Sequence, residues 1–296
     1  MYRILISGAS GLIGSVLASA LESHGHEVTR LVRRPTGSGN ELQWDPMHEV
    51  SPELVSGFEV VIHLSGESVA GRWTAEKKRR IRESRVVSTN NLSRALAKAE
   101  TPPRTFICAS AIGYYGSRGN EILTEESPPG SGFLPEVCRE WEGATESAER
   151  VGIRTVNLRF GIVLSRQGGA LKEMLLPFRL GLGGKLGSGR QWYSWIHIDD
   201  VVSGVMHILA APIVTGPVNM TAPNPVTNAD FTRALAAALN RPAIFSVPTF
   251  AAKLAFGEFA EEGLLASARV IPKRLGDRGF EFRYPELGPA LAQLFS

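Results

Sequence analysis

Three glycines at the start of the chain have the spacing of a phosphate-binding turn. They are Gly8, Gly11 and Gly14, in the run Gly-Ala-Ser-Gly-Leu-Ile-Gly. In such a turn the first glycine permits a tight bend, the second lets backbone approach a pyrophosphate, and the third lets the next helix pack closely. The first N–H groups of that helix then face the phosphates. The pattern predicts a dinucleotide site contacted by Gly8, Ser10, Gly11, Leu12, Ile13 and Gly14.

The sequence on either side of the glycines supports this interpretation. Residues 2–6 are a short apolar run rich in strand formers, and residues 12–21 carry apolar side chains at helical spacing. A glycine triplet alone is weak evidence, because turns collect glycine for other reasons. A strand that ends in the triplet and a helix that begins within it are the context that a dinucleotide-binding motif requires.

Charges at the end of the second expected strand indicate which dinucleotide the site takes. That strand covers residues 27–33, and its only acid, Glu27, lies at its amino end. An NAD site places an acid at the carboxyl end, where it binds the adenosine ribose. Here Arg33 and Arg34 occupy that end, and a guanidinium can bind a 2′-phosphate with two hydrogen bonds. We therefore predict NADP(H); the alternative is that both arginines are solvated loop charges.

The elements that must position these residues alternate along the first half of the chain. Helical patterns at 74–99 and 133–151 separate apolar strand patterns at 60–64, 104–108 and 154–158. Continuous apolar strands between helices indicate an α/β fold with a parallel sheet covered on both faces. Ligands of such sheets lie at the carboxyl ends of the strands.

The expected architecture is a Rossmann-type, doubly wound parallel sheet with a smaller C-terminal substrate subdomain. We expect the cofactor-binding domain to span residues 1–165, with 190–220 returning to it. Residues 166–189 and 221–296 then form the substrate subdomain. The glycine-rich segment 181–189 has the composition of a loop that closes over a ligand, or of a long surface connection.

Composition excludes several other classes of protein. The chain has 296 residues and a formal net charge of +3. Its two cysteines and six histidines show no disulfide framework or metal-ligand spacing. The basic run 76–85 has the pattern of a charged helix without stacking aromatics, so no nucleic-acid partner is expected. No apolar run approaches the length of a membrane span, so no membrane partner is expected either. We expect a cytoplasmic protein, monomeric or homodimeric, whose partner is a small-molecule substrate.

Further motifs make the resemblance to a known family specific. The chain resembles the extended or atypical short-chain dehydrogenase/reductases, and within them an epimerase-like subgroup with its own short C-terminal domain. The matching stretches cover nearly the whole length: Gly8–Gly14, His63–Glu67, Arg72-Trp73, Ser84-Arg85, Ser110–Gly116, Pro177–Gly184, Gly187–Gln191, Trp195–Asp200 and the segment that begins at Pro272.

The resemblance implies acid–base chemistry that this sequence only partly retains. In the family a Ser polarises the substrate oxygen, a Tyr transfers its proton, and a Lys four residues later lowers the pKa of that Tyr. Ser110 matches the serine. None of the five tyrosines has a Lys at the fourth following position. Either Tyr114 or Tyr115, just beyond Ser110, carries the proton, or both only line the pocket.

The resemblance also suggests further contacts at lower specificity. The predicted cofactor contacts after the strands are Leu64, Ser65, Gly66, Glu67, Arg85, Ala109, Gly161 and Ile162. The predicted substrate-side residues are Gln191, Trp195 and His197.

Two functions are consistent with this pattern. The first is an NADP(H)-dependent oxidoreductase or epimerase-like enzyme. The second is a non-catalytic NADPH-binding sensor or scaffold that has kept the cofactor site and lost the usual catalysis.

The arginine interpretation makes a direct prediction. One charge-assisted contact to the 2′-phosphate should make NADPH bind roughly 10- to 100-fold more tightly than NADH. Replacing Arg33 with Asp should erase this preference, because a carboxylate repels the phosphate. Calorimetric titration of both cofactors checks this; if the preference survives the substitution, Arg33 is not the phosphate ligand.

Overall fold

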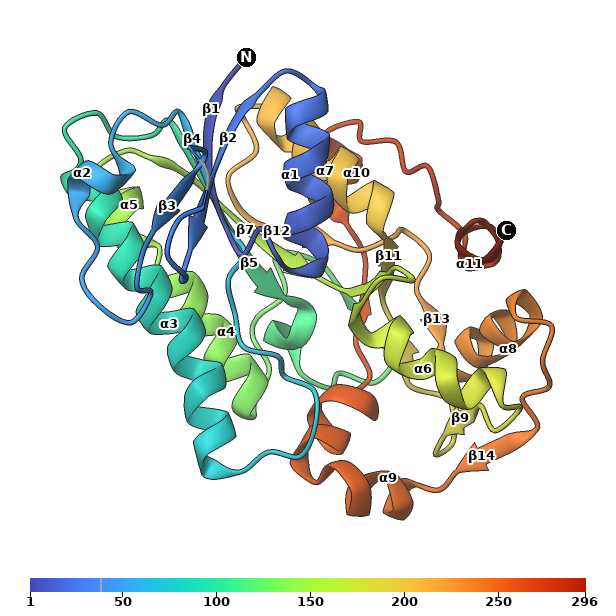
Figure 1. Cartoon of the computed structure of the whole chain (residues 1–296). Helices are drawn as coiled ribbons and strands as arrows, with labels where there is room; N and C mark the ends of the chain where they lie inside the picture. The colour runs from blue at the N-terminus through green and yellow to red at the C-terminus, as the bar shows by residue number, and fades with distance from the viewer. Residues whose placement is uncertain (38) are drawn as a thin grey trace.

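A seven-stranded sheet, in which every pairing is parallel, forms the centre of the fold (Figure 1). The computed structural model describes residues 1–37 and 39–296. The strand order is β12-β7-β5-β4-β1-β2-β3. The strands are β1 (Arg3–Ser7), β2 (Glu27–Val32), β3 (Glu41–Gln43), β4 (Val60–His63), β5 (Thr105–Ala111), β7 (Arg154–Phe160) and β12 (Gly216–Met220). This confirms the predicted fold class.

Helices cover both faces of this sheet. Successive side chains of a strand point to opposite faces, and here both sets are apolar and need to be buried. On one face, Ile4 and Ile6 pack with residues of α1 (Leu12–Ser23) and α7 (Ile198–Ala210). On the other face, Leu5 packs with residues of the helices that follow β4 and β5. The elements on that second face are α2 (Pro52–Val55), α3 (Ala75–Lys98), α4 (Phe133–Gly143) and α5 (Glu146–Arg150).

Most of the remaining elements come from the C-terminal half of the chain and lie beside the sheet (Figure 1). Several of them share a separate core cluster that includes Trp195, Phe231 and Leu291. The helices are α6 (Gly169–Arg179), α8 (Asn228–Ala238), α9 (Thr249–Phe256), α10 (Lys273–Asp277) and α11 (Leu287–Phe295), with short turns at Ile112–Tyr115 and Ala260–Leu264. The strands are β6 (Ile122–Leu123), β8 (Ile162–Leu164), β9 (Gly184–Leu186), β10 (Trp192–Tyr193), β11 (Trp195–His197), β13 (Val226–Thr227), β14 (Phe245–Val247) and β15 (Arg269–Val270).

Three elements differ from the sequence-based expectation. The helix expected at 133–151 is divided into α4 and α5. The strands β3 and β12 are not predicted by the pattern, because edge strands are short and β12 contains Gly216 and Pro217. Both residues weaken a strand pattern, and proline is tolerated at a sheet edge.

A buried histidine joins the ends of the two central strands. The Ser7 hydroxyl on β1 lies 2.6 Å from His63 Nδ1 on β4, and both side chains are buried. His63 Nε2 lies 3.3 Å from the Ser88 hydroxyl on α3. Burial lowers the pKa of His63 from its usual 6.5 to about 4, so the folded protein keeps this imidazole neutral. This polar contact fixes the strand ends that carry the expected cofactor turns.

The depressed pKa of His63 predicts acid sensitivity. Between pH 6.5 and about 4 the unfolded chain binds a proton that the folded protein does not. The free energy of unfolding should therefore fall across this window as pH decreases, by about 3 kcal/mol in total. Urea unfolding at several pH values, compared with a His63→Gln variant, measures the contribution. An identical pH slope in the two proteins would contradict it.

Candidate cofactor and catalytic site

The predicted cofactor turns after β1 and β4 touch each other at the carboxyl end of the sheet. The chain passes from β1 to β2 on one side and returns to β4 on the other, which makes this position the topological switch point. Gly8 has φ +73°, and a Cβ there would lie 2.7 Å from the Leu64 carbonyl carbon and 2.9 Å from the Ser65 nitrogen. The site therefore needs glycine at position 8 for both conformation and space.

The start of α1 is arranged to receive an anion. Gly11 caps the helix without a side-chain hydrogen bond, and the first turn contains no acid. Ser10 and Gly11 are exposed, and a Cβ on Gly14 would overlap the Gly8 carbonyl oxygen. The Leu12 side chain lies against Gly168 and Gly169, which brings the start of α6 beside the same turn. Unsatisfied N–H groups at a helix N-terminus favour negative charge.

The structure distinguishes the two arginines after β2. The Arg34 guanidinium donates hydrogen bonds of 2.6 and 3.1 Å to the Glu41 carboxylate on β3. Glu41 also accepts a hydrogen bond from the Gly37 nitrogen, and these contacts lower its pKa, with the Gly37 bond contributing most. Arg33 is exposed and has no ion-pair partner among the described residues. Arg33 is therefore the cation available to an external phosphate.

Arg85 lies beneath the turn that follows β4. A Cβ on Gly66 would lie 3.4 Å from the Arg85 guanidinium carbon, which also lies 5.0 Å from the Trp141 ring centre. Burial lowers the pKa of Arg85, while the nearby Cys138 and Glu67 side chains act in the opposite direction. The half-buried guanidinium donates to the Ile81 carbonyl oxygen at 3.1 Å and forms no salt bridge with a described acid. Its other N–H groups suit an anionic or hydroxyl-rich ligand. The neighbouring Glu67 is instead paired with Lys77 at 2.7 Å.

Ser110, the predicted substrate hydrogen-bond donor, is part of a hydrogen-bond network within the protein. It lies on β5 next to Arg159 on β7 and is 2% exposed. Its hydroxyl donates to Glu142 Oε1 on α4 at 2.7 Å. The Glu142 carboxylate also accepts two hydrogen bonds of 2.7 Å from the Arg159 guanidinium. In this structure the Ser110 hydroxyl therefore donates inward to Glu142, and its role toward a substrate oxygen stays a prediction.

Tyr115 is also part of this internal network. Its side chain is fully buried, and its hydroxyl donates to Asn219 Oδ1 at 2.7 Å while accepting from Arg159 at 2.9 Å. Burial raises its pKa to about 12. The structure therefore argues against Tyr115 as a proton carrier, because the phenol is inaccessible and holds its proton strongly.

Tyr114 occupies a different environment. Its ring lies flat against the Arg159 guanidinium, with 3.5 Å between the guanidinium carbon and the ring centre, and contacts the edge of Tyr115. The side chain is partly exposed, and no described residue hydrogen-bonds its hydroxyl. Of the two predicted phenols, Tyr114 is the one that a small molecule can reach.

Three further predicted cofactor positions lie near the ends of β5 and β7. Ala109 is nearly buried within β5, so only its backbone is near the strand end. A Cβ on Gly161 would lie 2.6 Å from the Ser194 carbonyl oxygen, so the chain can pass there only with glycine. Ile162 begins β8 and pairs with Trp195.

The predicted substrate-side residues are held within the C-terminal core. Gln191 is buried and donates to the Leu186 carbonyl oxygen. Trp195 is fully buried, with its indole N–H donating to the Asn224 carbonyl oxygen. His197 is 1% exposed and contacts Gln293. All three side chains are buried in this structure, and their role on the substrate side stays a prediction.

The sequence contains signals for two important residues that the motifs do not single out. Arg159 is a charged residue between the apolar Leu158 and Phe160 near the end of β7, and Glu142 follows the buried Trp141 on α4. A buried charge must find a partner of opposite sign, so the two positions could have been paired from the sequence.

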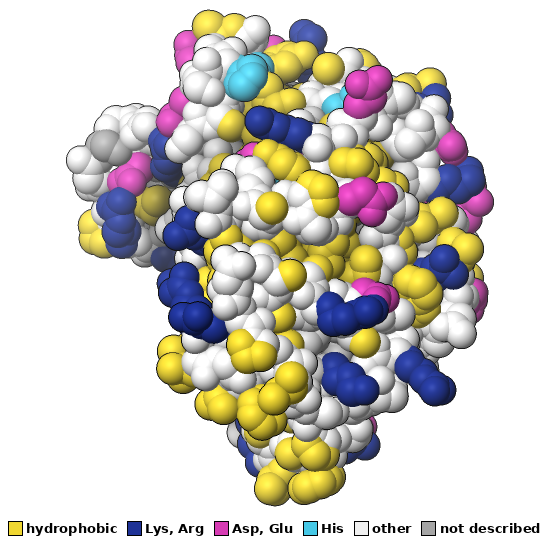
Figure 2. Space-filling model, turned by 90° about the vertical axis from the view of Figure 1, so that its right-hand side faces the viewer, with side chains coloured by type: hydrophobic (Ala, Val, Ile, Leu, Met, Phe, Trp, Pro, Cys, Tyr) yellow, Lys and Arg dark blue, Asp and Glu magenta, His cyan; other side chains and the backbone are white. Residues whose placement is uncertain are grey.

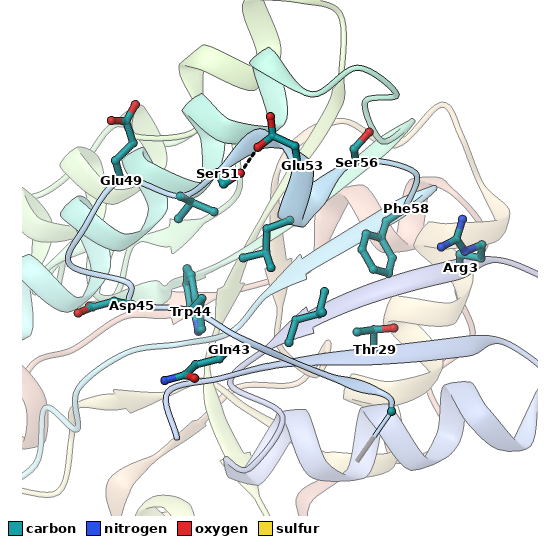
Figure 3. Close-up of a pocket in the computed structure, with 14 residues that line it drawn as sticks. Arg3, Thr29, Gln43, Trp44, Asp45, Glu49, Ser51, Glu53, Ser56 and Phe58 are labelled. Atoms are coloured by element: carbon teal, nitrogen blue, oxygen red, sulfur yellow. Dashed lines mark hydrogen bonds between the residues drawn. The ribbon is translucent and has the colours of Figure 1, made fainter. Parts of the chain in front are cut away.

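A large surface hollow lies away from these residues. It has a volume of about 780 Å³ and lies beside β3 and α2 (Figure 3). Trp44, Leu42, Leu54 and Phe58 line it together with carboxylates such as Glu53. None of the predicted cofactor or catalytic residues borders it, so the hollow is separate from the site at the switch point.

Two kinds of feature are absent from the described part of the chain. There, no helix is long and apolar enough to cross a membrane. In the same residues, no group of His, Cys, Asp and Glu side chains could hold a metal ion.

Comparisons with known proteins agree with this geometry. Residues 4–220 match the NAD dependent epimerase/dehydratase family, and residues 247–294 match a domain of unknown function, DUF1731. Epimerase family protein Mb2239 of Mycobacterium bovis is 44% identical over 290 residues, covering 97% of this chain and 96% of that protein.

Two solved structures have the same fold. The human epimerase family protein SDR39U1 with NADPH superposes with a TM-score of 0.90, at 35% identity and 99% coverage of both chains. A nucleoside-diphosphate sugar epimerase from Corynebacterium glutamicum gives a TM-score of 0.82 at 38% identity, covering 99% of this chain and 58% of that one.

The network around Glu142 predicts a large effect on stability. Glu142→Gln should lower the free energy of unfolding by about 3 kcal/mol, because it leaves the Arg159 cation buried without a counterion. Glu140→Gln on the same helix is the matched control, since Glu140 pairs only with the exposed Arg82 and should change stability by about 0.5 kcal/mol or less. Denaturant unfolding compares them; equal small effects would mean that the buried pair is not stabilising.

Proposed function

Because the chain belongs to the NAD dependent epimerase/dehydratase family, we propose that it is an NADP(H)-dependent oxidoreductase or epimerase-like enzyme. Its substrate would be a small molecule that carries a hydroxyl or carbonyl group. The observation that carries the proposal is the backbone contact of Gly8 with Leu64 and Ser65 at the switch point. The NADPH in the human SDR39U1 structure supports the choice of cofactor.

The residues at the switch point fit a dinucleotide. The Gly8–Gly14 turn and the start of α1 would hold the pyrophosphate, and the available Arg33 would bind the 2′-phosphate. Arg34 would position that loop through Glu41 rather than contact the phosphate. The turn Leu64–Glu67, Arg85, Ala109, Gly161 and Ile162 would line the path toward the nicotinamide end.

The chemistry must work without the usual Tyr–Lys pair. Bound NADP(H) supplies or accepts a hydride. We assign proton transfer to the Tyr114 hydroxyl, which is accessible and lies beside the Arg159 cation. Glu142 and Ser110 would position Arg159, and through it the Tyr114 ring.

The second candidate function is a non-catalytic NADPH-binding sensor or scaffold. The commitment of Ser110 and Tyr115 to internal hydrogen bonds favours it, because two of the three expected catalytic groups are not free. In this alternative the glycine-rich segment Gly181–Gly189 would report cofactor occupancy to a partner.

The proposal includes an organisation for the whole chain. Residues 1–165 and 190–220 would bind the cofactor, and residues 166–189 and 221–296 would hold the substrate. The buried, unpaired thiols of Cys108 and Cys138 fit a reducing compartment such as the cytoplasm. The protein would act as a monomer or homodimer.

A substrate screen with a tyrosine variant tests the enzyme proposal. NADPH oxidation should be followed across aldehydes, ketones, quinones and nucleotide sugars. With a substrate found, Tyr114→Phe should lower kcat roughly 100-fold or more, as expected for loss of an acid–base group, while NADPH affinity stays unchanged.

Tyr115→Phe is the comparison, because it removes a buried hydroxyl and should lower the melting temperature with little effect on kcat. Unchanged turnover in Tyr114→Phe would remove Tyr114 from the mechanism. Tight NADPH binding with no turnover of any compound class would favour the sensor.

A further inference from the structure

One lobe of the molecule exposes an unusual number of large apolar side chains. Thirteen such residues are exposed in the described chain, and eight of them fall within two short segments. Three have exposed fractions above 70%: Ile244 at 82%, Leu254 at 74% and Phe250 at 72%. The other five are Leu176, Leu180, Leu182, Phe245 and Phe256. Large exposed apolar patches with polar surroundings mark interaction surfaces.

The two segments, residues 170–190 and 240–257, form one continuous lobe. Strand β9 pairs with β14, which brings Gly184 beside Phe245. The Arg241 guanidinium donates to the Arg179 carbonyl oxygen at 3.0 Å, which joins the second segment to the end of α6. Helix α9 follows β14 at the lower edge of the molecule, and Ala252 is its only buried residue (Figure 1). We call these residues the basic lobe.

The charge of the basic lobe is strongly one-sided. Its two segments contain six lysines and arginines against a single acid, Glu173. Lys253 pairs with Glu261. The other five are exposed and have no ion-pair partner among the described residues: Lys172, Arg179, Lys185, Arg190 and Arg241. Figure 2 shows the side of the molecule that lies to the right in Figure 1. Hydrophobic side chains gather at its narrow lower end, with Lys and Arg beside them and the acids mainly higher up.

We propose that the basic lobe docks on the surface of an anionic lipid bilayer. Exposed Phe and Leu on a short helix, bordered by Lys and Arg, match the composition of surface-bound membrane segments. Each cation near such a surface gains from its negative potential. The sequence analysis expects no membrane partner because no apolar run is long enough to span a bilayer. Docking on the bilayer surface does not require a spanning helix.

The test is co-sedimentation of the purified full chain with lipid vesicles. Vesicles of phosphatidylcholine containing about one third phosphatidylglycerol should bind the protein, and raised salt should release it because the attraction between charges is screened. Vesicles of phosphatidylcholine alone should bind roughly tenfold less. Equal binding to both, or none to either, would overturn the proposal.

Two sets of variants separate the contributions of the lobe. The double variant Phe250→Glu with Leu254→Glu should weaken vesicle binding by about tenfold or more, and so should Arg179→Glu with Arg241→Glu. The matched control is Val151→Glu with Ile213→Glu, two similarly exposed apolar residues outside the lobe. It should bind as the wild type does. Equal losses in all three variants would show that the lobe is not the docking surface.

Two further measurements separate membrane docking from misfolding and from self-association. The NADPH affinity and the melting temperature of the lobe variants should equal those of the wild type. This result would show that the variants are folded, and it does not require the protein to be an enzyme. Light scattering reports the oligomeric state. A wild-type dimer that Phe250→Glu with Leu254→Glu converts to a monomer, without any vesicle binding, would identify a second copy as the occupant and overturn the membrane proposal.

Discussion

The backbone contact between two turns at the carboxyl end of the sheet determines the rest of the site. Gly8 and the Leu64–Ser65 backbone approach so closely that a single Cβ would not fit between them. The contact exists because β1 and β4 are neighbours, joined at their ends by Ser7 and His63. It also places the first turn of α1 at the switch point, where the free N–H groups of the helix favour an anion.

A buried hydrogen-bond network around Glu142 is the second constraint on the site. Glu142 occupies the buried side of α4 and ties together Ser110 and Arg159, while Arg159 supports both tyrosines. This network hydrogen-bonds the Ser110 and Tyr115 hydroxyls internally and leaves Tyr114 partly exposed. The proposed chemistry therefore differs from the usual Ser–Tyr–Lys arrangement of the family.

The features that depend on local pattern could be predicted from the sequence. The α/β class, the central strands and the family were predictable because glycine spacing and apolar periodicity report directly on backbone geometry, and comparison with known proteins confirms the family. The failures have long-range causes. Arg34 is neutralised by Glu41 from a strand too short to recognise, and Ser110 meets Glu142 only after the chain folds. The family resemblance suggested Gln191, Trp195 and His197 as substrate-side residues, and a resemblance does not report how deeply a side chain is buried.

Parallel calorimetric titration of the wild-type protein with NADPH and NADH tests the dinucleotide site at the switch point. We expect one cofactor per chain, with NADPH bound at least roughly tenfold more tightly, because Arg33 adds a charge-assisted contact to a site that the glycine turns create. Equal affinity for the two cofactors would contradict the role of Arg33. Binding of neither would show that the contact between Gly8 and the Leu64–Ser65 backbone does not form a dinucleotide site.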